Sequence, residues 1–573
     1  MQWNKHYIKK TTSPKTVHII GGGIGGMEAA RVLKLRGHNP IIHEKSDVLG
    51  GTFIPASAES YKGKLRELLE WYRLQMKKLN IEVKLNDEVK DIAVFGDAPV
   101  IVATGSTPRQ LRRVPGYEKM VEACEFLTGT PVGDTVAVIG GGPAGYSAAI
   151  TAAKSGLKTA LIEKDELGGV CLNRGCIPSK AMLHSAKIFR QTLDSEKFGV
   201  TCKEADFNLD AALAHKNDVI CQLKCGIADS LEHAGVKVIN AEAHIKGKAA
   251  GLFITTAGEN DIYSKNLLIC TGSRPKELDI PGADITDVSD VYNLDTIPKS
   301  AAIIGGGASG LEAAEYLNAL GCRASVIEQA ERIAPTMDKD ISAFLRRSLK
   351  KSGINILTSC RAVSADGGSI KYTDTRGKEK TAEADIIINA SGRTACYDGL
   401  GIENIGLENL NTDSHMQTAV PGVYAAGDAN QKALSAHAAY RESAAAINNI
   451  LGKTDEIDYL AIPQVVFTFS EAASIGETLE SALAKGIDAV CGEAPLRSSG
   501  RFFAEGGQDG FCKIISENTS GRLLGVHIAG GNASELIYGA AAMLASKMTV
   551  EEIKNTAFPH PTVSEAIREA VFR

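Results

Sequence analysis

Residues 136–163 of the chain have the sequence "VAVIGGGPAGYSAAITAAKSGLKTALIE". This is the pattern of an apolar strand, a glycine-rich turn, a helix of small residues and a second apolar strand that ends in an acid. The same design occurs at 17–44, "VHIIGGGIGGMEAARVLKLRGHNPIIHE", and at 301–328, "AAIIGGGASGLEAAEYLNALGCRASVIE". The three turns place their glycines alike, at Gly140, Gly142 and Gly145, at Gly21, Gly23 and Gly26, and at Gly305, Gly307 and Gly310. The closing acids stand at the same offset from the first glycine and are Glu163, Glu44 and Glu328.

Each glycine of such a turn has a physical task. The first permits the tight turn, the second lets a pyrophosphate approach the backbone, and the third lets helix and strand pack closely. The helix N-terminus attracts the phosphates, and the closing acid accepts hydrogen bonds from a ribose hydroxyl. The repeats therefore predict three Rossmann-type dinucleotide-binding units, although one copy alone is also compatible with a turn that binds nothing.

The third copy bears on the choice of nicotinamide nucleotide. Glu328 would bind a 2′-hydroxyl and repel a 2′-phosphate, which favours NAD over NADP. Arg332 follows four residues later and would soften this preference.

Two further phrases indicate a flavin. The stretch "LLICTGSRP" at 267–275 is an apolar strand that leads into Thr271, Gly272 and Ser273. The stretch "VPGVYAAGDAN" at 420–430 ends near Asp428, which either accepts hydrogen bonds from the ribityl chain of FAD or is a turn residue. The stretch that ends near Asp428 occurs once in the sequence, whereas the glycine-rich turn occurs three times.

Two cysteines lie five residues apart in "GGVCLNRGCIPSKAML" at 168–183. Zinc is disfavoured because Cys171 and Cys176 have no second cluster of ligands. A regular helix would separate their Cα atoms by roughly 7.5 Å of rise, beyond the roughly 7 Å limit for a disulfide. A disulfide therefore requires an irregular turn, for which Gly175 and Pro178 are suited, and a constrained bridge of this kind favours redox activity.

The C-terminal stretch "NTAFPHPTVSEAIREAVFR" offers a base. His560 lies between two prolines, and Glu565 follows five residues later. A carboxylate commonly orients an imidazole and raises its basicity. Alternatively, Thr562 to Glu565 forms a capping box at a helix start; the two interpretations are compatible.

The composition is that of an ordinary soluble protein. The chain has 573 residues, 44% hydrophobic and 23% charged, with a net charge of −5 and a pI near 6.2. These values disfavour nucleic acid and membrane partners. No stretch resembles a signal peptide or a membrane span, so we expect a cytoplasmic location. A second cysteine pair, Cys221 and Cys225, has helical spacing and is expected to pack in the core.

From about residue 134 onward the chain resembles the pyridine nucleotide–disulfide oxidoreductases, and among them the dihydrolipoamide dehydrogenases. The stretches that carry the resemblance are "GGVCLNRGCIPSK" (168–180), "IEQAERIAPTMDKDIS" (327–342), "AAGDA" (425–429), "LSAHAA" (434–439), "IPQVVFTFSEAASIGET" (462–478) and "HPTVSEA" (560–566). The resemblance implies an FAD- and NAD-dependent homodimer that oxidises dihydrolipoamide carried by the lipoyl protein of a 2-oxoacid dehydrogenase or glycine cleavage system.

The resemblance also implies roles for single residues. Cys176 would contact the flavin, and Cys171 would exchange with substrate. Lys180 would lie near the flavin and pair with Glu312. His560, oriented by Glu565, would act on the cysteines of the partner subunit. The cofactor-binding residues that the resemblance adds are Ala436, His437 and Gly392.

The chain departs from this family in two places. Ala395 and Cys396 replace the usual Pro-Asn after the Gly-Arg of the NAD-binding domain, beside the nicotinamide nucleotide. By the stretches "GHNPIIHEK" (37–45), "LGG" (49–51), "YKGKLRELLEWYRLQMKKLNIEV" (61–83) and "VIVATGSTP" (100–108), residues 1–130 resemble the first FAD-domain segment of 2-enoate and 2,4-dienoyl-CoA reductases instead. That module would hold a second FAD or another adenine nucleotide, or act as a docking domain. An NADH-dependent reductase of another disulfide or acceptor is the alternative function.

We therefore expect an α/β flavoprotein with an additional N-terminal Rossmann-like unit and a C-terminal α+β dimerisation domain. The expected segments are the N-terminal module (1–130), the first FAD-binding segment (131–298), the NAD-binding domain (299–395), the closing FAD-binding segment (396–455) and the interface domain (456–573).

Overall fold

The computed structural model describes residues 8–58, 62–107, 135–366 and 368–573. The chain divides into two compact units, 1–133 and 134–573. The boundary predicted between residues 130 and 131 lies outside the described residues, and the other segment boundaries stay predictions.

The first unit contains a parallel sheet in the order β3-β2-β1-β4. Its elements are β1 (Thr16–Ile20), α1 (Ile24–Leu35), β2 (Asn39–His43), α2 (Phe53–Ala56), α3 (Gly63–Lys78), β3 (Glu82–Lys84), η2 (Ile92–Phe95) and β4 (Val100–Val102). The strands are rich in β-branched residues, and α1 starts directly after Gly23. Ile19 and Ile42 from the sheet are buried with Met27, Leu69 and Met76 from the helices. This is the predicted additional Rossmann-like unit.

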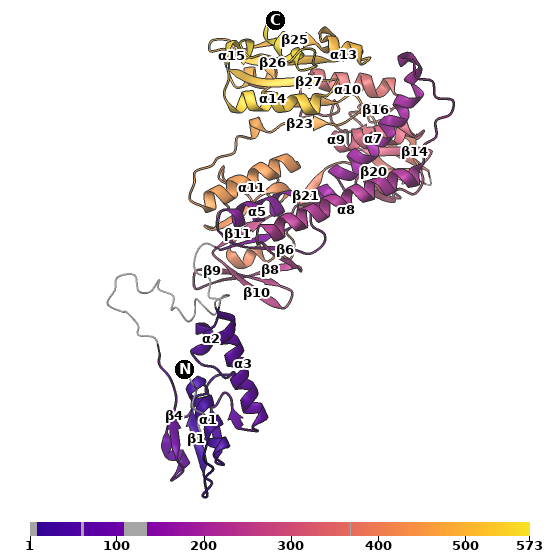
Figure 1. Ribbon diagram of the computed structural model, residues 1–573. Coiled ribbons are helices and arrows are strands. Elements are labelled where there is room, and N and C mark those ends of the chain that lie inside the picture. The colour runs from indigo at the N-terminus through magenta and orange to yellow at the C-terminus, as the bar shows by residue number, and fades with distance from the viewer. Residues whose placement is uncertain (1–7, 59–61, 108–134, 367) are drawn as a thin grey trace. The chain divides into compact units, whose positions relative to one another are not determined.

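The second unit begins with a five-stranded parallel sheet in the order β22-β11-β5-β6-β7. Its elements are β5 (Thr135–Ile139), α5 (Pro143–Lys154), β6 (Lys158–Glu163), α6 (Gly169–Asn173), α7 (Cys176–Leu193), η4 (Ser195–Phe198), α8 (Leu209–His233), β7 (Lys237–Asn240), β11 (Asn266–Ile269), η6 (Ile402–Ile405), β22 (Val423–Ala425), η7 (Gly427–Asn430) and α11 (Ala436–Ile450). The chain returns to this sheet late, and α11 lies alongside α5 (Figure 1).

A second parallel sheet has the order β13-β20-β14-β15-β16. Its elements are β13 (Ile285–Asp287), η5 (Asp290–Asn293), β14 (Ser300–Ile304), α9 (Ala308–Ala319), β15 (Arg323–Glu328), α10 (Lys339–Lys351), β16 (Asn355–Thr358) and β20 (Ile386–Asn389). The strand β13 precedes the boundary predicted at residue 299, yet it pairs with β20. Short strands β12 (Ser273–Pro275) and β21 (Arg393–Ala395) pair with each other where the chain crosses between the two sheets.

Each parallel sheet of the second unit is accompanied by a three-stranded antiparallel sheet. The strands are β8 (Ala243–Ala249), β9 (Leu252–Ala257) and β10 (Asn260–Ser264) in one, and β17 (Arg361–Asp366), β18 (Ser369–Thr373) and β19 (Glu379–Glu383) in the other. Phe253 of β9 is fully buried against Ile269 and Leu267 of β11, so the first of these covers the face of the sheet.

The C-terminal part is an antiparallel sheet in the order β23-β24-β27-β26-β25, with helices packed on it. Its elements are η8 (Tyr459–Ala461), β23 (Gln464–Val466), β24 (Ala472–Gly476), α12 (Leu479–Ala484), β25 (Ala489–Pro495), η9 (Leu496–Ser498), α13 (Gly500–Ala504), β26 (Phe511–Glu517), β27 (Leu523–Ala529), α14 (Ala533–Ala545), α15 (Val550–Lys554) and α16 (Glu565–Val571). The α/β fold class with an α+β C-terminal domain is therefore confirmed.

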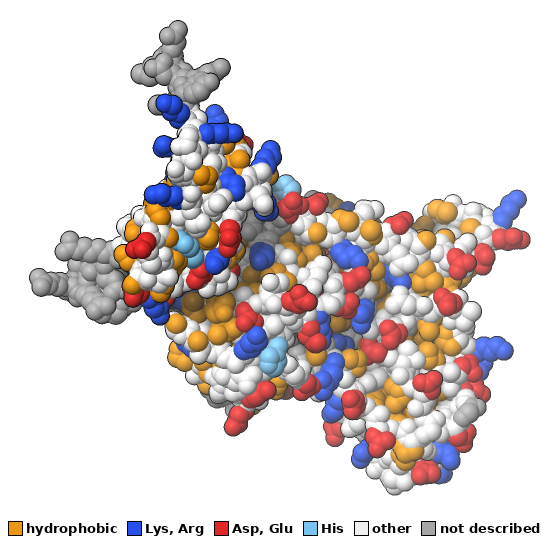
Figure 2. All heavy atoms as spheres, turned by 90° about the horizontal axis from the view of Figure 1, so that it is seen from below, with side chains coloured by type: hydrophobic (Ala, Val, Ile, Leu, Met, Phe, Trp, Pro, Cys, Tyr) orange, Lys and Arg blue, Asp and Glu red, His pale blue; other side chains and the backbone are white. Residues whose placement is uncertain are grey.

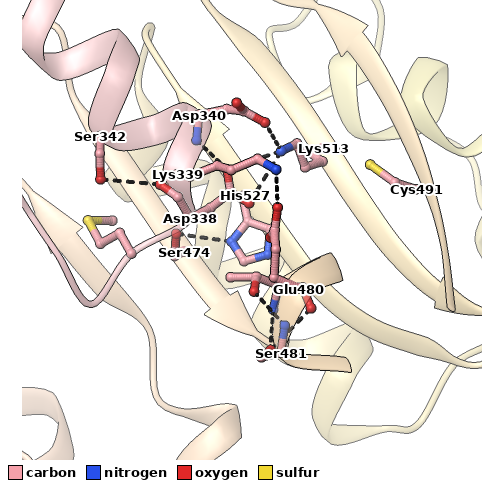
Figure 3. A network of polar contacts seen from close by, with 12 residues as sticks. Asp338, Lys339, Asp340, Ser342, Ser474, Glu480, Ser481, Cys491, Lys513 and His527 are labelled. Carbon is pink, nitrogen blue, oxygen red and sulfur yellow. Dashed lines mark hydrogen bonds and ion pairs between the residues drawn. The ribbon is translucent and has the colours of Figure 1, made fainter. Parts of the chain in front are cut away.

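A buried polar network fastens this C-terminal sheet to the second parallel-sheet region (Figure 3). Lys513 on β26 lies 3.1 Å from the carboxylate of Asp338, which is completely buried, and also pairs with Asp340 at the start of α10. His527 on β27 is fully buried too, and its Nδ1 lies 3.0 Å from the hydroxyl of Ser474. Because buried charges are stable only when paired, this network ties the two regions together.

The helix α8 corrects one prediction. Cys221 and Cys225 are both exposed, not packed in the core. The buried stripe of α8 runs through Ala212, Lys216 and Leu231, so the cysteines lie outside it. The helical spacing correctly put both thiols on one face, but it did not say which face is covered.

Figure 2 shows acidic and basic side chains interspersed over the face that it displays. Among the described residues, no helix combines the length and apolar character that a bilayer crossing requires. The described residues also contain no group of three or more His, Cys, Asp or Glu side chains suited to hold a metal ion.

Candidate functional site

The two predicted redox cysteines lie on consecutive helices. Cys171 is in the short helix α6, and Cys176 is the first residue of the long helix α7. Between them the helical path breaks at Arg174 and Gly175, and the Gly175 N–H donates to Val170 O at 2.7 Å. This is the irregular turn that a close pair of cysteines needs. Both side chains are free thiols here, which is the reduced state of such a pair.

The two thiols differ in acidity. The pKa of Cys176 is lowered, first by a hydrogen bond from the Cys171 thiol and then by the nearby Lys180 ammonium, against a cost of burial. The pKa of Cys171 is raised by the same hydrogen bond and by burial. The helix N-terminus also favours a negative charge at Cys176. The pair thus retains one proton on Cys171 while Cys176 becomes the thiolate.

Lys180 stands one helical turn after Cys176 and is held from two sides. Its Nζ lies 2.7 Å from a carboxylate oxygen of Glu312 on α9. The same ammonium lies 4.2 Å from the centre of the Phe467 ring. The expected contact between Lys180 and Glu312 is present, whereas the cation–π contact with Phe467 had no recognisable signal in the sequence.

A cleft of about 1310 Å³ contains both cysteines. It is lined by helix termini, strand ends and loops from both parallel-sheet regions and from the C-terminal segment that includes β23. The predicted site residues that line it are Gly140, Gly142, Glu163, Cys171, Cys176, Lys180, Thr271, Gly272, Ser273, Glu312, Gly392, Asp428, Ala436 and His437. Residues far apart in the chain therefore converge on one cleft, of a size that suits a dinucleotide.

Two polar atoms in the cleft wall lack partners. Asn173 Oδ1 and Thr271 Oγ1 are buried and have no hydrogen-bond partner among the described residues. Buried polar atoms are normally satisfied, so a polar ligand in the cleft fits here. Gly142 adds room, because a Cβ there would meet nothing closer than 3.9 Å. The residues present therefore fit FAD along the turn at Gly140.

The acids at the ends of the second strands have a task that the sequence did not reveal. In every copy one carboxylate oxygen accepts the N–H of the residue after the first glycine, and the other accepts the N–H two residues beyond the acid. The first set is Glu44 with Gly22, Glu163 with Gly141 and Glu328 with Gly306. The second set is Glu44 with Ser46, Glu163 with Asp165 and Glu328 with Ala330. A carboxylate has about four acceptor positions, so each acid holds the turn and keeps capacity for a ribose hydroxyl.

The glycines show which positions the fold itself demands. A Cβ on Gly140 or Gly305 would lie 2.2 and 2.3 Å from a backbone oxygen of the neighbouring strand connection. A Cβ on Gly145 or Gly310 would clash with the carbonyl of the first glycine of its own turn. A Cβ on Gly307 would meet nothing within 4 Å, so that glycine leaves open space in front of the helix.

Asp428 in η7 is held by Ser273, whose hydroxyl donates to its carboxylate. Arg393 in turn donates to the Ser273 hydroxyl and carbonyl, each at 2.8 Å. This chain of contacts links β12, β21 and η7, and Arg393 was not anticipated. His437 at the start of α11 donates from Nε2 to Pro463 O at 2.7 Å, so its ring orientation is set by the main chain.

The predicted dyad at the C-terminus is formed within one chain. His560 Nδ1 lies 2.8 Å from Glu565 Oε1, and 76% of the His560 side chain is exposed. The His560 hydrogen bond and the Thr562 N–H lower the pKa of Glu565. His560 is not among the described residues that line the cleft of its own chain.

The capping prediction in this region needs correction. The helix α16 begins at Glu565 with Ser564 as N-cap, not after Thr562. The Thr562 hydroxyl donates to Pro559 O, while its N–H donates to Glu565 at 3.0 Å. Only the half of the capping box that Glu565 supplies is therefore present.

Comparison with known proteins gives a consistent result. The family described as pyridine nucleotide-disulphide oxidoreductase matches residues 134–443, and its dimerisation domain matches residues 462–571. A dihydrolipoyl dehydrogenase of Chlorobaculum tepidum is 36% identical over 451 residues, 76% of this chain and 96% of that protein. Leghemoglobin reductase of Glycine max is 36% identical over 463 residues, 78% of this chain and 88% of that protein.

The fold is matched by solved structures as well. The structure of LpdA from Mycobacterium tuberculosis has a TM-score of 0.71 at 26% identity, over 77% of this chain and 99% of that one. The family implies FAD and a nicotinamide dinucleotide as cofactors, and the dimerisation domain implies a homodimer. From the thiol pair, the cleft and these matches, the chain belongs to the pyridine nucleotide-disulphide oxidoreductases, a family of flavoenzymes.

Proposed function

We propose that the chain oxidises protein-bound dihydrolipoamide to lipoamide through Cys171 and Cys176, with reduction of NAD. The observation that carries this proposal is the divided acidity of the thiol pair inside a dinucleotide-sized cleft. Cys171, with the higher pKa, suits exchange with substrate. Cys176, with the lower pKa, suits the role of leaving thiolate.

The proposed exchange balances as follows. One substrate thiolate attacks the Cys171 sulfur of the oxidised pair, the Cys171–Cys176 bond breaks, and Cys176 leaves as a thiolate beside Lys180. The second substrate thiolate then attacks the sulfur that is bound to Cys171, closes the lipoamide disulfide and releases Cys171. The substrate loses two electrons and two protons, and His560 of the partner subunit receives a proton from the substrate thiol. FAD, when bound, supplies the passage of the electron pair from the dithiol to the nicotinamide.

The preference for NAD is supported by the surroundings of Glu328. Arg332, the cation that would favour a 2′-phosphate, donates from one terminal nitrogen to Pro335 O at 3.0 Å and to Met337 O at 3.2 Å. That nitrogen is thus occupied by the main chain, while Glu328 stays at the end of β15. We infer that a 2′-hydroxyl is preferred.

The test is the oxidation of free dihydrolipoamide by the purified holoenzyme, with NADP in place of NAD and glutathione in place of dihydrolipoamide as controls. Turnover with NAD and dihydrolipoamide only would support the proposal. Reduction of the flavin by NADH without turnover of dihydrolipoamide would overturn it. The lipoyl protein of a 2-oxoacid dehydrogenase or glycine cleavage system is the proposed physiological partner, and it should lower the KM relative to free dihydrolipoamide.

A second candidate is an NADH-driven reductase of another disulfide or acceptor. The relative named leghemoglobin reductase favours it, because that name describes an acceptor other than lipoamide. Cys171→Ser distinguishes dihydrolipoamide oxidation from the reduction of an acceptor directly by the flavin. It abolishes any reaction that needs disulfide exchange and spares an acceptor that takes electrons directly from the flavin.

For the first unit we propose an auxiliary nucleotide site at Gly21, Gly23, Gly26 and Glu44, which takes a second FAD or another adenine nucleotide. Its turn repeats the geometry of the other two, with Gly22 N–H 2.6 Å from Glu44, and a Cβ on Gly23 would meet nothing within 4 Å. Native mass spectrometry with added nucleotides tests this proposal. One FAD per chain and nothing further would favour a docking role instead.

A further inference from the structure

Two glutamates on α9 hold the segment that follows β23. Glu312 accepts the N–H of Phe467 at 3.1 Å, and Glu315 accepts the N–H of Phe469. Residues three apart share one face of a helix, so Glu312 and Glu315 lie on the same side of α9. From that side, α9 holds two N–H groups of the bent segment that follows β23.

The position of this segment matters to the thiol pair. Phe467 lies with its ring 4.2 Å from the Lys180 ammonium, whose other neighbour is Glu312. Lys180 in turn lowers the pKa of Cys176. Any shift of residues 467–469 therefore moves one wall of the Lys180 site.

Glu312 pairs with Lys180 and lines the cleft, whereas Glu315 has no role so far. Only 2% of Glu315 is exposed, and Glu315 is not among the described residues that line the cleft. A buried carboxylate is costly unless it is hydrogen-bonded, so its presence calls for a reason. The hydrogen bond to Phe469 is the contact that distinguishes it from an apolar residue of the same size.

Resting on the proposed function of the thiol pair, we propose that Glu315 is a positioning residue, which holds Phe469 and thereby keeps Phe467 and Lys180 where they stabilise the Cys176 thiolate. It touches neither substrate nor cofactor. It acts through the segment that follows β23.

The charge state of Glu315 changes near neutral pH. Burial raises its pKa to about 7, while the Phe469 N–H and Lys187 on α7 lower it and Glu312 on α9 raises it. The carboxylate accepts the Phe469 N–H strongly, and the protonated acid accepts it weakly. The hold on the segment therefore weakens as the pH falls through about 7, so the reactivity of the thiol pair gains a second, indirect pH dependence.

The experiment is alkylation of the dithiol-reduced holoenzyme by iodoacetamide at pH 5 to 10, followed by mass spectrometry at Cys171 and Cys176. The variants are Glu315→Leu, which loses the acceptor, and Glu315→Gln, which keeps an acceptor but cannot ionise. Tyr316→Phe is the matched control, because Tyr316 is the next residue of α9 and is also buried.

In Glu315→Leu we expect the midpoint of Cys176 alkylation to rise by about 0.5–1 pH unit, part of the effect of losing a nearby cation. In Glu315→Gln we expect a smaller rise of the midpoint, because a neutral amide oxygen accepts the Phe469 N–H more weakly than a carboxylate does, and the inflection near pH 7 disappears. A Glu315→Leu midpoint equal to that of Tyr316→Phe would overturn the proposal.

If Glu315→Leu does not fold, Glu315→Gln decides alone, and an inflection near pH 7 that persists in it would overturn the proposal. Alkylation does not require turnover of dihydrolipoamide. If the alkylation midpoint shifts but the enzyme does not oxidise dihydrolipoamide, the positioning role of Glu315 is supported and only the proposed substrate is wrong.

Discussion

Lys180 on α7 and Glu312 on α9 form an ion pair with 2.7 Å between the ammonium and the carboxylate. They are 132 residues apart in the chain. The Glu312 side chain is 5% exposed. The pair therefore joins a buried carboxylate on α9 to the first turns of the helix that starts at Cys176. The first prediction concerns the effect of this pair on the thiols.

Lys180→Met should raise the pKa of the Cys176 thiol by about 1–3 units, because it removes a cation that lowers this pKa. The pH dependence of alkylation of the reduced holoenzyme measures this shift. Lys164→Met is the matched control, since Lys164 is a largely exposed cation that pairs with Glu242 at 3.1 Å. Equal midpoints in the two variants would rule out Lys180 as the source of the lowered pKa.

Mixed dimers test whether His560 serves the partner subunit. Cys171→Ser and His560→Gln homodimers should each be inactive. Refolded together at equal amounts, half of the dimers are mixed, and each has one site that combines an intact thiol pair with an intact base. We expect the activity to recover to about a quarter of that of the unmodified enzyme. No recovery would mean that the base and the thiols must belong to one chain.

Lys513→Met should destabilise the fold by about 3–5 kcal/mol, because it leaves the completely buried Asp338 without its cation. Urea unfolding of the holoenzyme measures this loss. The neighbouring Lys339→Met is the control, since Lys339 and Glu480 are both about half exposed and water screens such a pair. Both pairs are seen in Figure 3. Similar losses in the two variants would contradict a special role for the buried pair.

Glu315→Gln should stabilise the fold at alkaline pH. The pKa of Glu315 is raised to about 7 by burial, so its protonated form favours the folded state. The contribution of protonated Glu315 to folding stability is complete below pH 4.5, the ordinary pKa of a glutamate, and is lost as the pH rises through 7. Removing the charge should therefore add about 3 kcal/mol at pH 8 and less than about 1 kcal/mol at pH 5. Urea unfolding at both values, with the exposed Glu383→Gln for comparison, checks this; a pH-independent effect would refute it.

Gly140→Ala and Gly142→Ala should fail in different ways. Gly140 has φ +102°, and a Cβ there would lie 2.2 Å from Cys270 O, so this variant should fold poorly. Gly142 has φ −72° and open space in front of it, so its alanine variant should fold and lose FAD. Flavin content per folded chain, from absorbance and circular dichroism, tests this contrast. Full flavin content in Gly142→Ala would show that the pyrophosphate lies elsewhere.

Much of the fold and of the thiol site could be predicted from short sequence patterns. The three glycine-rich turns follow from steric demands within about thirty residues, so the sequence alone indicated three Rossmann-type units. The break between Cys171 and Cys176 was likewise foreseeable, since Gly175 lies between them and a regular helix cannot bring the thiols together. The closing acids were located correctly, although their bonds to the turn at Gly22, Gly141 and Gly306 became visible only in the structure.

Tertiary structure decided the features that depend on which surfaces meet. Helical spacing placed Cys221 and Cys225 on one face of α8, but only packing against α7 and its neighbours determined that this face is exposed. Glu315 looks like any helical glutamate in the sequence, and it becomes a buried acceptor because Phe469, 154 residues later, lies against it. Sequence periodicity reports contacts within an element, whereas burial and long-range pairing are set by parts of the chain that are distant in sequence.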